Sequence, residues 1–252
     1  DINVHGTTNL LRVAQRAGVS RFIHTSTPSV VSWRQDIENG ERNLPHARRH
    51  TAHYPSTKAE AERIVLAANA PTFGTVALRP HLIFGPGDPH LLPRFVTGAM
   101  RGRLRVIGNG RNRVDFTYID NAAWAHLDAA DALGKPGATC AGRAYFISND
   151  EPVDLWPWFN QLLTKLDLPP ITRSIPHRPA RALFRAVEFI HRLLPLGEPM
   201  VTAFLADAMA RSHWFDMAPA RRELGYHPRV SMHDGILATV PDLRRRVVGL
   251  QA

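Results

Sequence analysis

Apolar residues near the start of the chain alternate between helical and strand patterns. Residues 1–17 carry apolar positions at helical spacing, and Gly18 suits the left-handed position that follows a helix. A short β-rich run at 19–26 ends in hydroxyl residues. A second helix is predicted over 54–68, and a second strand over 75–79. This order of helix and strand predicts an α/β fold with a parallel sheet.

The remaining segments extend the pattern. Residues 32–50 are polar, lack an apolar period and are predicted to form a loop. Pro55 suits the first position of its helix, Asp120 suits an N-cap, and Gly134 suits the position after a helix. Further segments are predicted as helices at 91–101, 120–133 and 182–194, as a strand and turn at 104–110, and as strands at 114–118 and 143–148.

These elements favour a doubly wound, Rossmann-like parallel sheet with a smaller, mostly helical lobe. The carboxyl ends of the predicted strands are where polar residues collect in this sequence. Because ligands of such sheets bind at that edge, we expect the functional groups to lie there.

Tyr54 and Lys58 are four residues apart in the second predicted helix, so they share one helix face. An ammonium beside a phenol favours the phenolate and is expected to lower the pKa of Tyr54, making it a general acid or base. Only three residues of the chain are lysine, so such a pair arises by chance about 0.05 times. The sequence therefore predicts a catalytic tyrosine–lysine pair.

The hydroxyls of Ser26 and Thr27 close the preceding predicted strand. Either one could donate a hydrogen bond to the oxygen that Tyr54 protonates. Ser and Thr are also common in turns, so these two residues alone would indicate only a turn.

Other groups give weaker signals. No metal site is predicted, because the histidines form no cluster with ligand spacing. The histidines that would suit a metal or a base are His24 and His81. The lone cysteine, Cys140, has no neighbouring group that would activate its thiol. Asp88 and Asp115 could act as acids or bases, whereas Asp120 is better explained as a helix cap.

Composition sets limits on partners and compartment. The net charge is +9, but the basic residues are scattered and no nucleic-acid-binding motif is present, so nucleic acid is not a predicted partner. An anionic substrate, an acidic partner or a membrane surface would explain the charge equally well. With one cysteine, no signal-peptide pattern and no apolar run of about 18–20 residues, the chain is predicted to be cytoplasmic.

Several motifs together resemble a known family. The tyrosine–lysine pair, the hydroxyl-rich strand end, residues 3–7 (NVHGT) and residues 78–86 (LRPHLIFGP) resemble the extended short-chain dehydrogenases/reductases, and within them the 3β-hydroxysteroid dehydrogenase branch. Two subgroups match best. Residues 79–89, 107–115 and 146–152 are similar to sterol-4-carboxylate 3-dehydrogenases, and residues 25–30 and 217–226 to bacterial 2-alkyl-3-oxoalkanoate reductases of olefin biosynthesis.

The resemblance implies roles for particular residues. It implies that Tyr54 is the proton donor and acceptor, and that Lys58 holds the nicotinamide ribose. Thr27 falls on the catalytic hydroxyl position, with Ser26 as the alternative. The cofactor-binding residues expected besides Tyr54 and Lys58 are Pro80, His81 and Asn3.

The resemblance also implies a domain division and a missing segment. Residues 1–83 and 114–149 would belong to the dinucleotide-binding domain, and 84–113 and 150–252 to the substrate lobe. The family begins with a strand and a glycine-rich turn for the pyrophosphate, which this sequence lacks. We therefore expect the sequence to be N-terminally incomplete by roughly 60–80 residues and to bind dinucleotide poorly by itself.

The activity implied is interconversion of a 3-oxo and a 3-hydroxy group on a lipid-like β-keto or β-hydroxy acid, with NADP or NAD as cofactor and NADPH favoured. Oxidation of a 4-carboxysterol and epimerisation or dehydration of a nucleotide sugar remain alternatives, as does a non-catalytic scaffold. The expected partners are a small lipid-like substrate and a second copy in a homodimer through the helices at 1–17 and 58–68. The basic amphipathic helix at 182–194 could cover an apolar cleft, contact a membrane surface or simply pack within the lobe. Association with a membrane surface or a multienzyme assembly is a further expectation.

Overall fold

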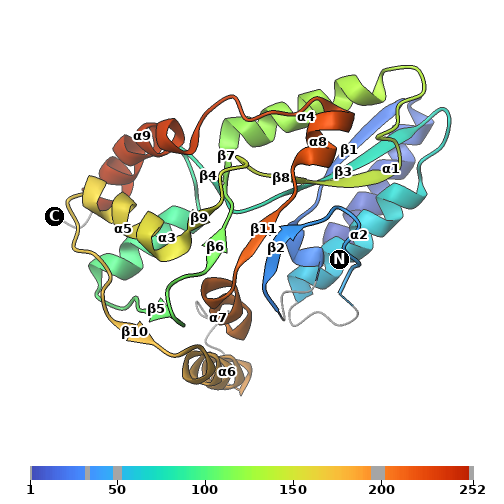
Figure 1. Ribbon diagram of the computed structural model, residues 1–252. Helices are drawn as coiled ribbons and strands as arrows, with labels where there is room; N and C mark the ends of the chain where they lie inside the picture. Colours follow the sequence, from blue (N-terminus) through green and yellow to red (C-terminus); the bar gives the residue numbers. More distant parts are fainter. Residues whose placement is uncertain (1, 32–34, 48–52, 194–201, 250–252) are drawn as a thin grey trace.

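The computed structural model describes residues 2–31, 35–47, 53–193 and 202–249. A three-stranded parallel sheet lies between helices on its two faces (Figure 1). This three-layer arrangement confirms the predicted Rossmann-like α/β fold. In spatial order, the strands of this sheet are β1 (Arg21–Thr25), β3 (Gly74–Pro80) and β8 (Arg143–Ile147).

The central strand β3 holds the sheet together. Six of its seven residues are buried, because helices cover both of its faces. Leu78 pairs with Thr25 of β1 on one side and with Tyr145 of β8 on the other. Pro80 ends the strand and has no N–H to extend the ladder. All three strands therefore present their carboxyl ends at one edge.

Helices α1 (Thr7–Arg16) and α2 (His53–Ala67) cover one face of this sheet, and α4 (Ile119–Leu133) covers the other (Figure 1). Small side chains of α4, such as Ala125 and Ala129, pack against alternate residues of β3. Because successive side chains of a strand point to opposite faces of the sheet, one set of β3 side chains faces α4 and the other faces α2.

The lobe has an aromatic core. Phe116 stacks on Trp158 with ring centroids 4.1 Å apart, and Phe95 stacks on Phe159 at 3.6 Å. Such buried aromatic surface contributes strongly to stability. The helices around this core are α3 (Leu91–Met100), α5 (Leu155–Lys165) and α9 (Met232–Leu243).

A second sheet of four short strands joins segments distant in the chain, in the order β2–β11–β6–β9. The predicted loop over 32–50 is wrong in part, because β2 lies within it. Its sequence IENG gave no strand signal, because its pairing comes from β11, about 175 residues later. These strands are β2 (Ile37–Gly40), β11 (His213–Phe215), β6 (Arg113–Val114) and β9 (Val153–Asp154).

The predicted strand at 114–118 is interrupted in the structure, where it forms the two short strands β6 and β7. The remaining described elements connect the two sheets and the lobe. They are the π-helical turns Ile2–Gly6 and Arg244–Val248, the 3-10 turn Pro28–Val30, β4 (Ile83–Phe84), β5 (Val106–Ile107), β7 (Thr117–Tyr118), β10 (Ser174–Ile175), α6 (His177–Leu193), α7 (Ala203–Ala210) and α8 (Ala218–Leu224).

Helix ends test the predicted caps. Gly18 has φ of 71° after α1, so its left-handed role is confirmed. Gly134 directly follows α4, as predicted, with φ of −75° rather than a left-handed conformation. Asp120 is not the N-cap, because Tyr118 holds that position and Asp120 lies inside the first turn. Pro55 is the third residue of α2 rather than the first, a place that its missing N–H still permits.

Candidate functional site

Tyr54 and Lys58 lie in the first turns of α2, beside the carboxyl end of β1. The Lys58 ammonium donates a hydrogen bond of 2.5 Å to the carbonyl oxygen of Thr25. This contact fixes α2 against the last residue of β1. The predicted pair therefore lies at the sheet edge where ligands of such folds bind.

Thr27 lies close enough to the Tyr54 phenol to affect its pKa. Thr27 begins the 3-10 turn, and its Oγ1 accepts a bond of 3.3 Å from the backbone N–H of Ser29. The Thr27 and Ser29 hydroxyl oxygens are 3.0 Å apart. A phenol and a hydroxyl can thus reach one substrate oxygen from the same side.

The electrostatics of the pair differ from the prediction. Burial raises the pKa of Tyr54, although its residue is 55% exposed, and the nearby Thr27 side chain opposes the rise. Burial also lowers the pKa of Lys58, opposed by the charge of Glu62. The expected lowering of the Tyr54 pKa by Lys58 is therefore wrong here, because the ammonium is directed to the Thr25 carbonyl.

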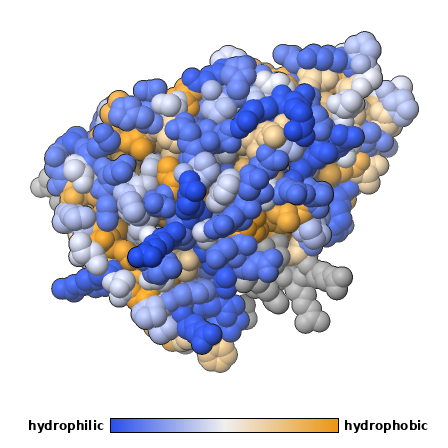
Figure 2. Space-filling model, in the orientation of Figure 1, coloured by the Kyte–Doolittle hydropathy of each residue, from blue (hydrophilic) through white to orange (hydrophobic). Residues whose placement is uncertain are grey.

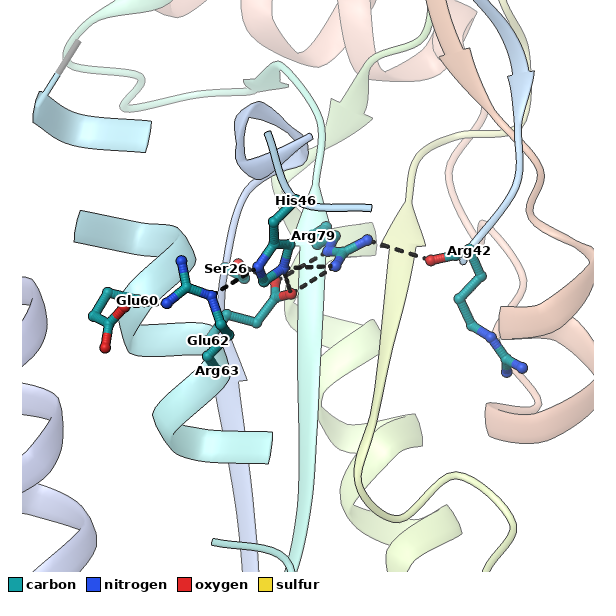
Figure 3. Close-up of polar contacts among 7 residues, drawn as sticks. All are labelled: Ser26, Arg42, His46, Glu60, Glu62, Arg63 and Arg79. Atoms are coloured by element: carbon teal, nitrogen blue, oxygen red, sulfur yellow. Dashed lines mark hydrogen bonds and ion pairs between the residues drawn. The ribbon is translucent and has the colours of Figure 1, made fainter. Parts of the chain in front are cut away.

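Ser26 belongs to a buried network around Glu62 (Figure 3). Its hydroxyl donates a bond of 2.5 Å to Glu62 Oε2, and Arg79 of β3 donates through Nε at 3.0 Å and through a terminal nitrogen at 2.6 Å. His46 Nε2 lies 2.7 Å from Glu62 Oε1. Ser26 is thus committed to Glu62, which leaves Thr27 as the hydroxyl beside Tyr54.

The bonds to Glu62 determine its charge. Burial alone would raise the pKa of this fully buried carboxyl, but the bonds from His46, Arg79 and Ser26 and the charge of Arg79 hold it at about 2. Nε2 of His46 is the donor to Glu62, because the other ring nitrogen, Nδ1, accepts from Arg63 Nε at 3.3 Å. The network therefore pairs one carboxylate with one guanidinium.

The other predicted cofactor-binding residues have structural partners. Asn3 donates a bond of 3.0 Å to the Thr57 hydroxyl, one residue before Lys58. Pro80 is the last paired residue of β3. The backbone N–H of His81 is bonded to the carbonyl of Ile147 and the hydroxyl of Thr117, and its side chain turns inward. Asn3 is thus bonded to the helical turn that carries Tyr54 and Lys58. The buried ring of His81 is not directed to that turn.

The remaining candidates are explained by local structure. Asp88 accepts from three backbone N–H groups at the start of α3, as a cap does. Cys140 is buried, and burial raises the pKa of its thiol. Among the described residues, no group of three or more His, Cys, Asp or Glu side chains could hold a metal ion.

Sequence reasoning missed Glu62, His46, Arg79 and His213. Two of these left a signal. Glu62 continues the four-residue spacing of Tyr54 and Lys58 along one face of α2, and Arg79 is a charge inside an otherwise apolar strand, which requires a buried partner. The others are brought in by a loop and by a distant strand that no local pattern predicts.

Comparisons with known proteins identify the family. Residues 1–176 match the 3-beta hydroxysteroid dehydrogenase/isomerase family. The chain belongs to this family. A 2-alkyl-3-oxoalkanoate reductase from Stenotrophomonas maltophilia is 46% identical over 93% of this chain and 72% of the relative. This confirms the family recognised from the motifs, whose members are oxidoreductases acting on CH–OH groups with a nicotinamide cofactor.

Two further relatives have the same coverage pattern. A 2-alkyl-3-oxoalkanoate reductase from Shewanella oneidensis is 40% identical over 93% of this chain and 62% of the relative. The human sterol-4-alpha-carboxylate 3-dehydrogenase, decarboxylating, is 38% identical over 98% of this chain and 68% of the relative. The chain thus spans between 62% and 72% of the length of these three relatives.

Solved structures support the fold. A UDP-glucuronic acid 4-epimerase from Bacillus cereus in complex with NAD superimposes with a TM-score of 0.70 at 19% identity, over 96% of this chain and 67% of that one. The structure of RMD from Pseudomonas aeruginosa complexed with NADPH gives 0.66 at 18% identity, over 97% and 74%. At these identities the likeness shows the fold alone.

The buried carboxylate makes a testable contribution to stability. Glu62→Gln should lower the free energy of unfolding by about 3 kcal/mol at pH 7, because Arg79 is left buried without a countercharge. Since the Glu62 pKa is lowered from 4.5 to about 2, this stabilisation is present above about pH 4.5 and is lost as the pH falls towards 2. Urea unfolding as a function of pH measures it.

The neighbouring Glu60→Gln is the matched control, because Glu60 is 47% exposed and, within the described part of the chain, its one ion pair is with Arg63 at the surface. It should cost less than about 1 kcal/mol. Equal stability of the two variants at pH 7 would contradict the assignment.

Proposed function

We propose that this chain carries the catalytic residues of a reductase that interconverts a 3-oxo and a 3-hydroxy group on a lipid-like β-keto or β-hydroxy acid. The observation that carries the proposal is the proximity of the Tyr54 phenol to the Thr27 hydroxyl beside Lys58, in a chain whose relatives bear the names given above. Both names describe an oxygen at position 3, one carbon away from a carbon that bears a carboxylate.

The residues present fit the nicotinamide end of a dinucleotide. The Lys58 ammonium and the half-exposed Tyr54 phenol offer donors at the carboxyl edge of the sheet, and Asn3 braces the same helical turn. The bound cofactor would supply the hydride. We favour NADPH over NADH, and the other cofactor contacts expected at Pro80 and His81 remain predictions.

In the reducing direction, Thr27 donates a hydrogen bond to the ketone oxygen, and Tyr54 gives that oxygen its proton as the carbon is reduced. The raised pKa of Tyr54 keeps the phenol protonated at neutral pH, which suits a proton donor. Lys58, one turn further along α2, would hold the nicotinamide ribose. Thr27 and Tyr54 therefore both act at the ketone oxygen.

Two domain-level expectations remain proposals. We propose that residues 1–83 and 114–149 form the dinucleotide-binding part, and that 84–113 and 150–252 form the substrate lobe. The separate aromatic core around α3, α5 and α9 supports this division.

Dimerisation through α1 and α2 also stays a prediction, for which the exposed apolar Leu10 and Val13 of α1 would be interface residues.

Replacing the phenol tests the mechanism. In the whole protein, Tyr54→Phe should lower kcat for reduction of a 2-alkyl-3-oxo acid by about 100-fold or more, with little change in urea unfolding, because only the proton donor is lost. NADPH and NADH are assayed in parallel, as are a 4-carboxysterol and a UDP-sugar.

Tyr145→Phe is the control, because its hydroxyl bonds Glu223 on the α8 side of the sheet. It should keep its activity. Retention of most activity by the Tyr54 variant would contradict the mechanism, and turnover of only the sterol or the sugar would replace the substrate class.

Helix α6 supports contact with a lipid surface. Figure 2 shows polar and apolar side chains together at the lower edge of the molecule, where α6 lies in Figure 1. Leu183, Phe189 and Leu193 are 54%, 61% and 67% exposed, and the exposed Arg178 and Arg185 make no ion pair with any other described residue. No helix in the described ranges is both long and apolar enough to span a membrane. We propose that α6 rests on anionic lipid headgroups.

Vesicle sedimentation tests this surface. The whole protein should bind vesicles that contain a quarter phosphatidylglycerol and not neutral phosphatidylcholine vesicles, and the double variant Phe189→Ser/Leu193→Ser should lose the binding. Leu237→Ser, an exposed apolar residue of α9, should leave it unchanged. Absence of binding to the anionic vesicles would overturn the proposal.

A further inference from the structure

The residue at which the chain leaves the central strand has a backbone conformation that its type avoids. Leu82, two residues beyond the end of β3, has φ of 39°. The other described non-glycine residues with positive φ are Asn39, Asp150 and Asp167, whose short polar side chains tolerate this region. A leucine is strained there, because its Cβ comes too close to the following carbonyl oxygen. Among the described residues, Leu82 is the only apolar side chain held in this way.

The surroundings of Leu82 fix its backbone on both sides. Pro80 before it is still paired with β8, whereas Ile83 after it belongs to β4 and is paired with Thr117 of β7. The buried Thr117 hydroxyl donates to the carbonyl oxygen of His81 at 2.6 Å and accepts the N–H of the same residue at 3.1 Å. The Thr117 N–H donates to the carbonyl oxygen of Leu82 at 3.4 Å. The strained turn is therefore imposed where the chain passes from the three-stranded sheet to the lobe.

A glycine at this position would make the same turn without strain, because it has no Cβ. The chain uses one for that purpose five residues later, where Gly87 has φ of 80°. Backbone strain of this kind is found mainly at active sites and at residues that clamp a ligand. The leucine at position 82 thus indicates that its side chain has a use that offsets the strain.

The position of Leu82 relates it to the candidate site. Thr25 of β1 and Leu78 of β3 are paired, and the chain continues from them to Thr27 and to Leu82. Both residues therefore follow the carboxyl ends of neighbouring strands, where ligands of doubly wound sheets bind. Leu82 packs against the aromatic core of the lobe but is only partly buried. It thus brings apolar surface of the lobe to the edge that carries the Thr27 hydroxyl.

The chemistry of the side chain limits what it can bind. Leucine has no donor, acceptor or charge, so it can neither polarise the ketone nor hold the carboxylate. It can remove apolar surface of a ligand from water. The substrate proposed above has such a surface where an alkyl branch is attached to the carbon beside the ketone. Contact with that branch would favour a branched acid over an unbranched one.

We propose that Leu82 is a specificity-determining residue, whose side chain contacts the alkyl branch beside the reacting carbon of the substrate. This inference rests on the function proposed above. The strained backbone directs the leucine side chain to the branch, while Thr27 and Tyr54 act on the ketone oxygen. Leu82 therefore determines which acids are preferred and takes no part in the proton transfer.

The preference for a branched acid tests this role. In the whole protein, kcat/KM is measured for a 2-alkyl-3-oxo acid and for the same acid without the alkyl branch, with the nicotinamide cofactor that supports turnover. The ratio of the two values is the preference. Leu82→Asn introduces a polar side chain that tolerates the backbone, so the preference should fall about tenfold or more.

Two further variants separate this role from a structural one. Leu82→Met keeps an apolar side chain on the same strained backbone, so its preference should stay within about threefold of the wild type. Leu168→Asn is the matched control, because Leu168 is another partly buried leucine packed against the same core, in the turn after α5. It should leave the preference unchanged. Urea unfolding shows that each variant is folded.

Three results would overturn the inference while leaving the proposed function intact. They are an active wild type without preference for the branched acid, an unchanged preference in Leu82→Asn, and an equal loss of preference in Leu82→Asn and Leu168→Asn. A wild-type protein that reduces neither acid would instead defeat the proposed function, and this inference with it.

Discussion

The arrangement of the site depends on one buried carboxylate. Glu62 lies two turns along α2 from Tyr54, and it accepts hydrogen bonds from the end of β1, from β3 and from the loop after β2. An unpaired charge at this depth would cost several kcal/mol, so these segments are held together by the requirement to satisfy it. The orientation of α2, and with it that of Tyr54 and Lys58, follows from this constraint.

The Glu62 carboxylate gives the neighbouring hydroxyls of Ser26 and Thr27 different roles. Ser26 faces inward and donates to Glu62, whereas Thr27 begins a turn and faces the phenol. Sequence alone left the choice between them open, because both stand at the end of the same strand. The partner of Ser26 decides it, and that partner lies 36 residues later in the chain.

Local patterns predicted the parts of the fold that local physics determines. The helical period, the left-handed Gly18 and the apolar run of β3 each act over a few residues, and the structure confirms them. The strand β2 and the histidine at 213 escaped prediction because their partners are distant in sequence. The pKa of Tyr54 escaped for another reason: a four-residue spacing gives a shared face but not the direction of the ammonium, which here turns to Thr25.

The Ser26 hydroxyl is bonded to Glu62 and stabilises the fold, whereas the Thr27 hydroxyl is available to the substrate oxygen. The most direct test of these roles compares Thr27→Ala with Ser26→Ala in the whole protein, by kcat and by urea unfolding of each. We expect Thr27→Ala to lose about 100-fold in kcat and at most about 1 kcal/mol of stability, because only the cap of the 3-10 turn is lost with the hydroxyl. We expect Ser26→Ala to lose about 1–3 kcal/mol of stability while keeping most of its activity. The reverse pattern, with activity lost in Ser26→Ala and retained in Thr27→Ala, would contradict these roles.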